Sequence, residues 1–247
     1  MEAAPKLPRR DFWTIVCSLA GVTALSWLYL LSMAKHSCCL GISVWDAAYF
    51  WMMFTMWAIM MVGMMLPSAA PMILIYAAVA RKAKKQGMPI ASTWAFTLGY
   101  LLMWTAFSLL VTMVQWQLDK AALLSSSMVV NSSKLGAGFL IAAGIYQWLP
   151  VKDSCLRHCQ SPFHFISSHW QAGNLGAFWM GISHGIFCIG CCWVLMLLLF
   201  VGGVMNILWI ALITVFVLLE KLLLLGGKSV KITGALMMIT GAVMLTH

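Results

Sequence analysis

Residues 45–80 read WDAAYFWMMFTMWAIMMVGMMLPSAAPMILIYAAVA and carry no charge after Asp46. As a straight helix this stretch would be about 54 Å long, whereas the hydrocarbon core of a bilayer is about 30 Å thick. Pro67 and Pro71 each remove a backbone donor and clash one turn back, which bends a helix and frees the carbonyls of Gly63 and Pro67. We therefore predict a long, proline-kinked membrane helix whose freed carbonyls face protein, water or an ion.

The rest of the chain also has the composition of an integral membrane protein. Of its 247 residues, 63% are hydrophobic and 9% are charged, whereas soluble domains carry about 25% charged residues. The mean hydropathy is +0.94. A soluble, collagen-like, disordered or small disulfide-rich protein is excluded. The net charge of +9 is therefore interpreted as a topology signal and not as a nucleic-acid-binding surface.

Seven stretches meet or approach the length of a membrane helix. They are residues 12–34, 45–80, 91–117, 128–149, 172–201, 204–225 and 230–246. Polar residues 131–134 interrupt the start of the fourth stretch, so an arrangement with six spans stays open. We expect an all-α polytopic membrane protein with about seven transmembrane helices in a single domain over residues 1–247.

Lysine and arginine are distributed asymmetrically between these stretches. Twelve would lie on one side of the membrane and three on the other. By the positive-inside rule, the N-terminus, the basic segment Arg81–Lys85 and a Cys/His loop at residues 150–171 are cytoplasmic, and His247 is outside. We expect a multi-pass protein of the inner (cytoplasmic) membrane.

Seven of the 20 methionines lie in the 45–80 stretch before Pro67. Helical spacing places them in two neighbouring rows on one face: Met52, Met56, Met60 and Met64, and beside them Met53, Met61 and Met65. Core packing would explain these rows, because methionine fills irregular gaps. Thioethers are also soft, neutral ligands that suit Cu(I) and cost little to bury.

A second group of soft ligands lies within residues 172–201. His184, Cys188 and Cys191 are spaced i, i+4, i+7 on one helix face, with Cys192 adjacent. Another backbone could approach closely at three glycines, Gly181, Gly185 and Gly190. A helix-packing face with cysteine as a small hydrophobe is the alternative interpretation.

The antiparallel course of the two stretches places Cys188–Cys192 at the depth of Met52–Met61. We therefore predict that sulfur ligands from two helices converge within the membrane. A site of thiolates, His184 and a methionine thioether would suit Cu(I), and zinc could use the same cysteines and histidine.

The 150–171 loop holds another cluster, since Cys155, His158 and Cys159 lie within five residues. In a reducing compartment such clustering is typical of metal binding or of a reactive thiol pair. Incidental cysteines in an exposed loop are the alternative. A weaker cluster, His36–Cys39, would lie on the outer side.

Glu220 is an acidic residue inside an apolar stretch, with Lys221 beside it. We expect Glu220 near the cytoplasmic interface, in a local ion pair or snorkelling toward water. A proton relay or a ligand for a passing cation is the alternative.

At these motifs the chain resembles a family of bacterial polytopic membrane proteins known by the label DUF2182, described as predicted metal-binding proteins and sometimes named copper chaperones. The resemblance covers roughly residue 45 to the C-terminus. It rests on MWAIMMVGMMLP at 56–67 with Pro71, KDSCLRHC at 152–159 with Pro162, GISHG at 181–185, CIGCCW at 188–193, Met205-Asn206 and Glu220-Lys221. It implies a membrane topology and metal binding, and nothing carries over to His36–Cys39.

We expect a membrane protein that binds soft metal, chiefly Cu(I), for copper handling, relay or metalloenzyme assembly. The expected metal ligands are His184, Cys188, Cys191, Cys192, Met56, Met60, Met64, Cys155, His158 and Cys159. No haem is expected within this chain, because Cys-x-x-Cys-His is absent, and we assign no catalytic residue. The expected partners are the lipid bilayer and a membrane metalloenzyme or metallochaperone, without nucleic acid.

Two alternatives of other classes stay open. One is an accessory, structural subunit of a membrane metalloenzyme complex. The other is thiol–disulfide exchange at Cys188 and Cys191, with His184 lowering a thiol pKa.

Overall fold

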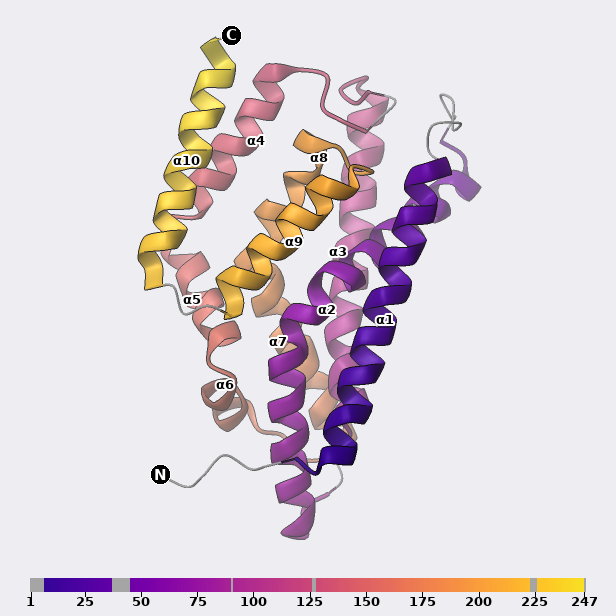
Figure 1. Ribbon diagram of the computed structural model, residues 1–247, viewed down its shortest axis with the longest axis vertical. Coiled ribbons are helices and arrows are strands. Elements are labelled where there is room, and N and C mark those ends of the chain that lie inside the picture. Colours follow the sequence, from indigo (N-terminus) through magenta and orange to yellow (C-terminus); the bar gives the residue numbers. More distant parts are fainter. Residues whose placement is uncertain (1–6, 37–44, 90, 126–127, 223–225, 247) are drawn as a thin grey trace.

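The computed structural model describes residues 7–36, 45–89, 91–125, 128–222 and 226–246 (Figure 1). Apart from an isolated bridge between Leu124 and Val130, the described part of the chain contains no strand pairing. The helices are α1 (Arg9–His36), α2 (Ala47–Lys85), α3 (Thr93–Lys120), α4 (Ser133–Tyr146), α5 (Pro150–Gln160), α6 (Pro162–His169), α7 (Gly173–Leu197), α8 (Leu199–Gly202), α9 (Ile207–Leu222) and α10 (Gly226–Thr246).

The all-helical class is confirmed, but seven membrane spans are not. Four helices within the described ranges are long and apolar enough to cross a membrane: α1, α2, α3 and α7 together with its extension α8. The apolar helix α4 and residues 230–246 of α10 are shorter. Helix α4 begins only at Ser133, and before it Leu124 and Val130 form an isolated bridge.

The bundle has two distinguishable ends. The basic end holds the start of α1 and the last turn of α2, with Lys82, Lys84 and Lys85 (Figure 1). At the opposite end α2 begins and α10 finishes (Figure 1). Asp46 caps the start of α2 there, since its Oδ1 accepts a hydrogen bond from the Tyr49 amide at 2.7 Å.

Helix α2 forms the centre of the molecule and carries the predicted kink. It runs for 39 residues through Pro67 and Pro71 and changes direction near its middle (Figure 1). The freed Gly63 carbonyl accepts a hydrogen bond from Trp27 Nε1 of α1 at 3.3 Å. A Cβ at Gly63 would lie only 3.0 Å from that of Ser26. Of the three partners that the sequence left open, protein, water or an ion, the Gly63 carbonyl therefore has protein.

Helices α3 and α7 pack backbone against backbone. A Cβ at Gly99 would lie 2.2 Å from the carbonyl oxygen of Phe178, and one at Gly181 would lie 2.0 Å from that of Phe96. Only glycine allows this approach, which confirms the prediction that Gly181 admits another backbone. The contact brings Tyr100 of α3 beside the Cys/His segment of α7.

Helices α4 and α10 form a second glycine-based pair at the edge of the bundle (Figure 1). A Cβ at Gly144 would lie 2.6 Å from the Gly234 carbonyl oxygen, and one at Gly241 would lie 2.9 Å from that of Ala137. The buried core instead follows α2. It includes Met53, Met56, Trp57, Met60, Met61, Met64 and Met65, each at most 1% exposed.

Candidate metal centre

The thiol of Cys188 is surrounded by side chains from several helices. Its Sγ accepts a hydrogen bond from Lys221 Nζ of α9 at 2.9 Å and lies 3.2 Å from the Tyr100 hydroxyl of α3. Lys221 Nζ also donates to Ser68 Oγ at 3.2 Å and reaches Met65 Sδ at 4.0 Å, both on α2. Cys188 and Lys221 are both buried. A buried ammonium group therefore links this thiol to the kinked part of α2.

The other two cysteines of α7 turn toward the same place. The thiols of Cys191 and Cys192 donate to the Cys188 carbonyl oxygen at 3.1 and 3.0 Å. Both side chains are buried, and the Cys192 thiol interacts with those of Cys188 and Cys191. The cysteines of α7 thus form one compact group of sulfur atoms.

Helix α5 adds its own cysteines to this group. The Cys159 thiol is near those of Cys188 and Cys191, and their influence together with burial raises the pKa of Cys159 well above the usual range. The Sγ of Cys155 lies against Gly190 of α7, where a Cβ would be only 2.8 Å away. Burial, with a smaller contribution from Cys191, raises the pKa of the Cys155 thiol. The two clusters that the sequence treats separately are therefore neighbours.

Residues 150–169 are helical and not a loop, since they form α5 and α6, and α5 packs on α7. Helix α9 holds α5 in place. Lys152 is fully buried, and its Nζ donates to Glu220 Oε1 at 2.7 Å. Gln160 Nε2 at the other end of α5 donates to the Glu220 carbonyl oxygen at 2.9 Å. The ion pair gives the buried Lys152 charge a counter-charge beside the apolar helices.

The expected interaction between Glu220 and Lys221 is wrong. Successive residues of a helix are about 100° apart around its axis, so these two side chains face different neighbours. Glu220 pairs with Lys152 of α5, and Lys221 turns inward to Cys188. Both are buried, so neither snorkels to water.

His184 lies one turn before Cys188 and is buried among aromatic rings. Its ring centroid is 5.5 Å from those of Tyr100 and Phe165 and 6.0 Å from that of Phe96. The Nδ1 atom has no hydrogen-bond partner within the described structure. A buried ring nitrogen without a partner needs a physical explanation, and a bound ion supplies one.

His158 lies apart from this arrangement. Its ring stacks on Phe187 with 4.2 Å between centroids, and its Nδ1 is 2.8 Å from the Ser154 carbonyl oxygen. The imidazole of His158 thus contacts a backbone carbonyl of its own helix and the Phe187 ring of α7.

The depth predicted for the cysteines needs correction. The residues of α2 beside Cys188 are Met65 and Ser68, reached through Lys221, and not Met52–Met61. Because α2 extends to Lys85, its middle falls near Leu66. The predicted ligands Met56, Met60 and Met64 are buried along α2, in the part that leads from Met65 toward the opposite end.

No three Cys, His, Asp or Glu side chains in the described ranges already form a metal-binding group. Cys17, Cys155, Cys159, Cys188, Cys191 and Cys192 are free thiols. Most of the His36–Cys39 cluster lies outside the described residues, and no side chain of it is described.

Sequence reasoning missed Lys221, Tyr100 and Ser68 as neighbours of the thiols. The lysine alone gave a usable signal, since an ionisable residue in an apolar stretch is expensive and is therefore expected to have a buried partner. Tyr100 and Ser68 gave none, because their role depends on how α2, α3 and α7 pack.

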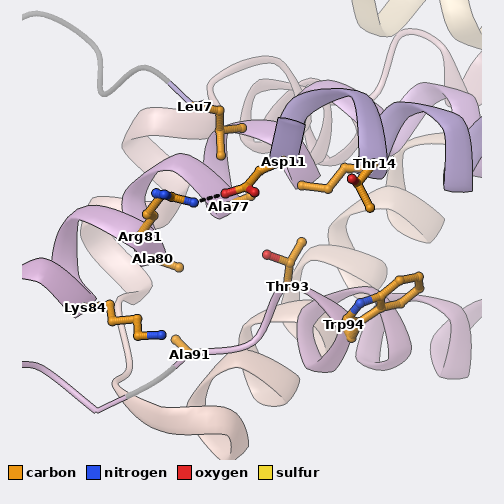
Figure 2. A pocket seen from close by; sticks show the side chains of 11 residues that line it. Leu7, Asp11, Thr14, Ala77, Ala80, Arg81, Lys84, Ala91, Thr93 and Trp94 are labelled. Carbon is orange, nitrogen blue, oxygen red and sulfur yellow. Dashed lines mark hydrogen bonds and ion pairs between the residues drawn. The ribbon is translucent and has the colours of Figure 1, made fainter. Parts of the chain in front are cut away.

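A cavity of about 290 Å³ at the basic end is separate from this site. It is bordered by α1, α2 and α3, where Arg81 pairs with Asp11 and where Lys84 and Trp94 also lie (Figure 2). None of its lining residues is a cysteine, histidine or methionine. This cavity therefore offers no soft ligand for a metal such as Cu(I).

Residues 54–244 match the model of the PpoB2 family, described as copper chaperone. The matched region covers most of the chain and contains all the sulfur ligands of the candidate site, so the protein belongs to this copper chaperone family. This confirms the resemblance found in the sequence. Neither a curated protein nor a solved structure gives a significant match.

Proposed function

We propose that the protein carries Cu(I) as cargo within a membrane, bound by the thiols of Cys159, Cys188 and Cys191. The observation that carries this proposal is the packing of α5 on α7, which sets the Cys155 sulfur against Gly190 and brings the Cys159 thiol near both thiols of α7. Two helices whose cysteines are about 30 residues apart in sequence, α5 and α7, would thereby provide the sulfur ligands of one site.

The chemistry of the surrounding groups supports Cu(I) as the cargo. Thiolate and thioether sulfur are soft ligands that select Cu(I), and Met65 Sδ lies beside Lys221 at the same point. The unpartnered Nδ1 of His184 offers a neutral imidazole. Carboxylates, which hard cations prefer, are scarce, since Glu220 is already paired with Lys152.

Lys221 gives the site a way to exchange its cargo. Without metal, its ammonium group donates to the Cys188 sulfur at 2.9 Å, where it occupies a lone pair that a metal would use. When Cu(I) binds, the thiol proton leaves, and the ammonium group keeps a partner in Ser68 Oγ at 3.2 Å. A site with such an internal competitor holds copper less tightly, as a chaperone that must release its cargo requires.

The orientation in the membrane is part of the proposal. By the positive-inside rule, the basic end with Lys82, Lys84 and Lys85 faces the cytoplasm of the inner membrane, and the opposite end faces outward. The recipient of the copper would be a membrane metalloenzyme that is being assembled.

The test is the thiolate-to-Cu(I) charge-transfer absorption of protein purified without oxygen and loaded with Cu(I). We expect this band in the wild type and in the Cys17→Ser control, because Cys17 is an exposed free thiol. It should disappear in Cys188→Ser/Cys191→Ser and weaken in Cys159→Ser. An unchanged band in the double variant, with its helix content intact by circular dichroism, would overturn the proposal.

A further inference from the structure

A second sulfur group lies near the opposite end of the bundle, around Gln115 of α3. The Gln115 side chain is buried, and its Oε1 accepts a hydrogen bond from Trp57 Nε1 at 2.5 Å. Its Nε2 donates to two thioethers, Met53 Sδ at 3.6 Å and Met128 Sδ at 3.4 Å. The sulfur atoms of two methionines from distant parts of the chain therefore both accept a hydrogen bond from the Gln115 side-chain nitrogen.

The turn between α3 and α4 holds Met128 in an unusual conformation. Its φ angle is +55°, in the left-handed region that residues other than glycine rarely adopt. The turn is fixed by backbone hydrogen bonds from Met128 to the Ser125 carbonyl at 2.8 Å and from Val130 to the Phe200 carbonyl at 3.0 Å. Backbone strain of this kind persists only where the surrounding structure enforces it. Met128 has this enforced backbone conformation, and its sulfur accepts the hydrogen bond from the buried Gln115 amide.

We propose that Met53 and Met128 form a separate binding site for Cu(I), or for another soft monovalent cation, at the opposite end of the bundle. Thioethers are neutral, so this site binds such a cation without releasing a proton and without a buried counter-charge. In the empty site, the Gln115 amide hydrogens occupy the lone pairs of both sulfurs. A soft cation takes the same lone pairs, and the carboxamide turns away from them.

The position of Met53 and Met128 near one end of α2 suits a site at which the ion enters the bundle. Met53 and Met65 lie on the same helix, about 18 Å apart along its axis. Between them Met56, Met60, Met61 and Met64 are buried. An ion received between Met53 and Met128 would therefore meet further thioethers on the way to the thiols. The binding site itself depends only on its own residues and goes beyond the proposed thiol site.

The experiment uses Ag(I) as the probe, because it is soft and monovalent like Cu(I) and resists oxidation. Binding to the full-length protein in detergent is measured by equilibrium dialysis and elemental analysis. We expect Met53→Leu/Met128→Leu to lose one Ag(I) per chain relative to the wild type. The control Met72→Leu/Met180→Leu changes two buried methionines in the basic-end half of the bundle and should lose none.

The two proposed sites fail independently in this experiment. Cys188→Ser/Cys191→Ser should lose the thiol-bound ion and keep the thioether-bound one. If Met53→Leu/Met128→Leu binds as much Ag(I) as the wild type, the thioether site is refuted while the thiol site stands. If instead the cysteine variant loses nothing, the thiol site is refuted while the thioether site stands.

Discussion

Lys221 of α9 and Cys188 of α7 form a buried contact in which Nζ and Sγ are 2.9 Å apart. A positive charge at this distance from a metal ligand acts on any cation that binds there. At an effective dielectric constant of 20, two unit charges about 4 Å apart interact by roughly 4 kcal/mol. A divalent ion experiences twice the repulsion of a monovalent one, so Lys221 favours Cu(I) over Zn(II).

We predict that Lys221→Met relaxes this discrimination by more than tenfold. Both metals require the same deprotonated thiols, so a change in thiol ionisation affects both and largely cancels in the ratio of their affinities. The measurement is a competition titration with Cu(I) and Zn(II) on wild type and variant. A ratio that stays constant, in a variant that still binds both metals, would contradict the electrostatic role of Lys221.

Removing one partner of the Lys152–Glu220 ion pair should destabilise the protein strongly. In Glu220→Gln the buried Lys152 ammonium group loses its counter-charge, and breaking a buried pair in this way costs about 3–5 kcal/mol. Thermal unfolding in detergent, followed by circular dichroism, should show a clear fall in Tm.

The double variant Lys152→Met/Glu220→Met is the control for this effect. It removes both charges, and replacing a buried ion pair by apolar residues is often neutral or stabilising. Its Tm should lie well above that of Glu220→Gln. An equally low Tm in both variants would mean that the fold requires these side chains for a reason other than charge pairing.

Cys155 should react slowly with iodoacetamide at pH 7. Only the thiolate is nucleophilic, and burial with a contribution from Cys191 raises the pKa of this thiol. Because the pKa is raised, the thiolate fraction is low at neutral pH, and the rate should keep rising above pH 8.5, the ordinary thiol pKa. Peptide mass spectrometry in a Cys17→Ser background measures it, and a rate that levels off below pH 8 would refute the prediction.

Gly181→Ala should separate α3 from α7. The new Cβ would lie 2.0 Å from the Phe96 carbonyl oxygen, and overpacking of this kind typically costs about 1–3 kcal/mol. The control is Gly138→Ala in α4, where a Cβ meets nothing within 4 Å and should be neutral or slightly stabilising. The difference in Tm between the two variants tests the contact, and a similar Tm for both would argue against it.

Local chemistry made part of this structure predictable. Each of the seven apolar stretches forms a helix, because a long apolar run must satisfy its own backbone hydrogen bonds. The bend in α2 follows from the ring of Pro67, and the close approach at Gly181 follows from its missing side chain. These features depend on residues within one turn of each other or on the absence of a side chain.

The position of α5 could not be predicted in the same way. Residues 150–160 include Lys152, Asp153 and Arg157, which by themselves indicate contact with water. Lys152 of this helix is nevertheless buried, because it pairs with Glu220 of α9, a partner 68 positions away in sequence. No spacing rule reveals that pairing, nor the packing of α5 on α7.

Trp27 connects the outermost part of the bundle to its centre. Helix α1 is the most exposed of the four long apolar helices, with 11% of its apolar window buried. Yet its indole satisfies the carbonyl that Pro67 frees at Gly63, and Met65 follows two residues later. One hydrogen bond therefore ties α1 to the bend of α2, close to the residue whose sulfur lies 4.0 Å from Lys221 Nζ.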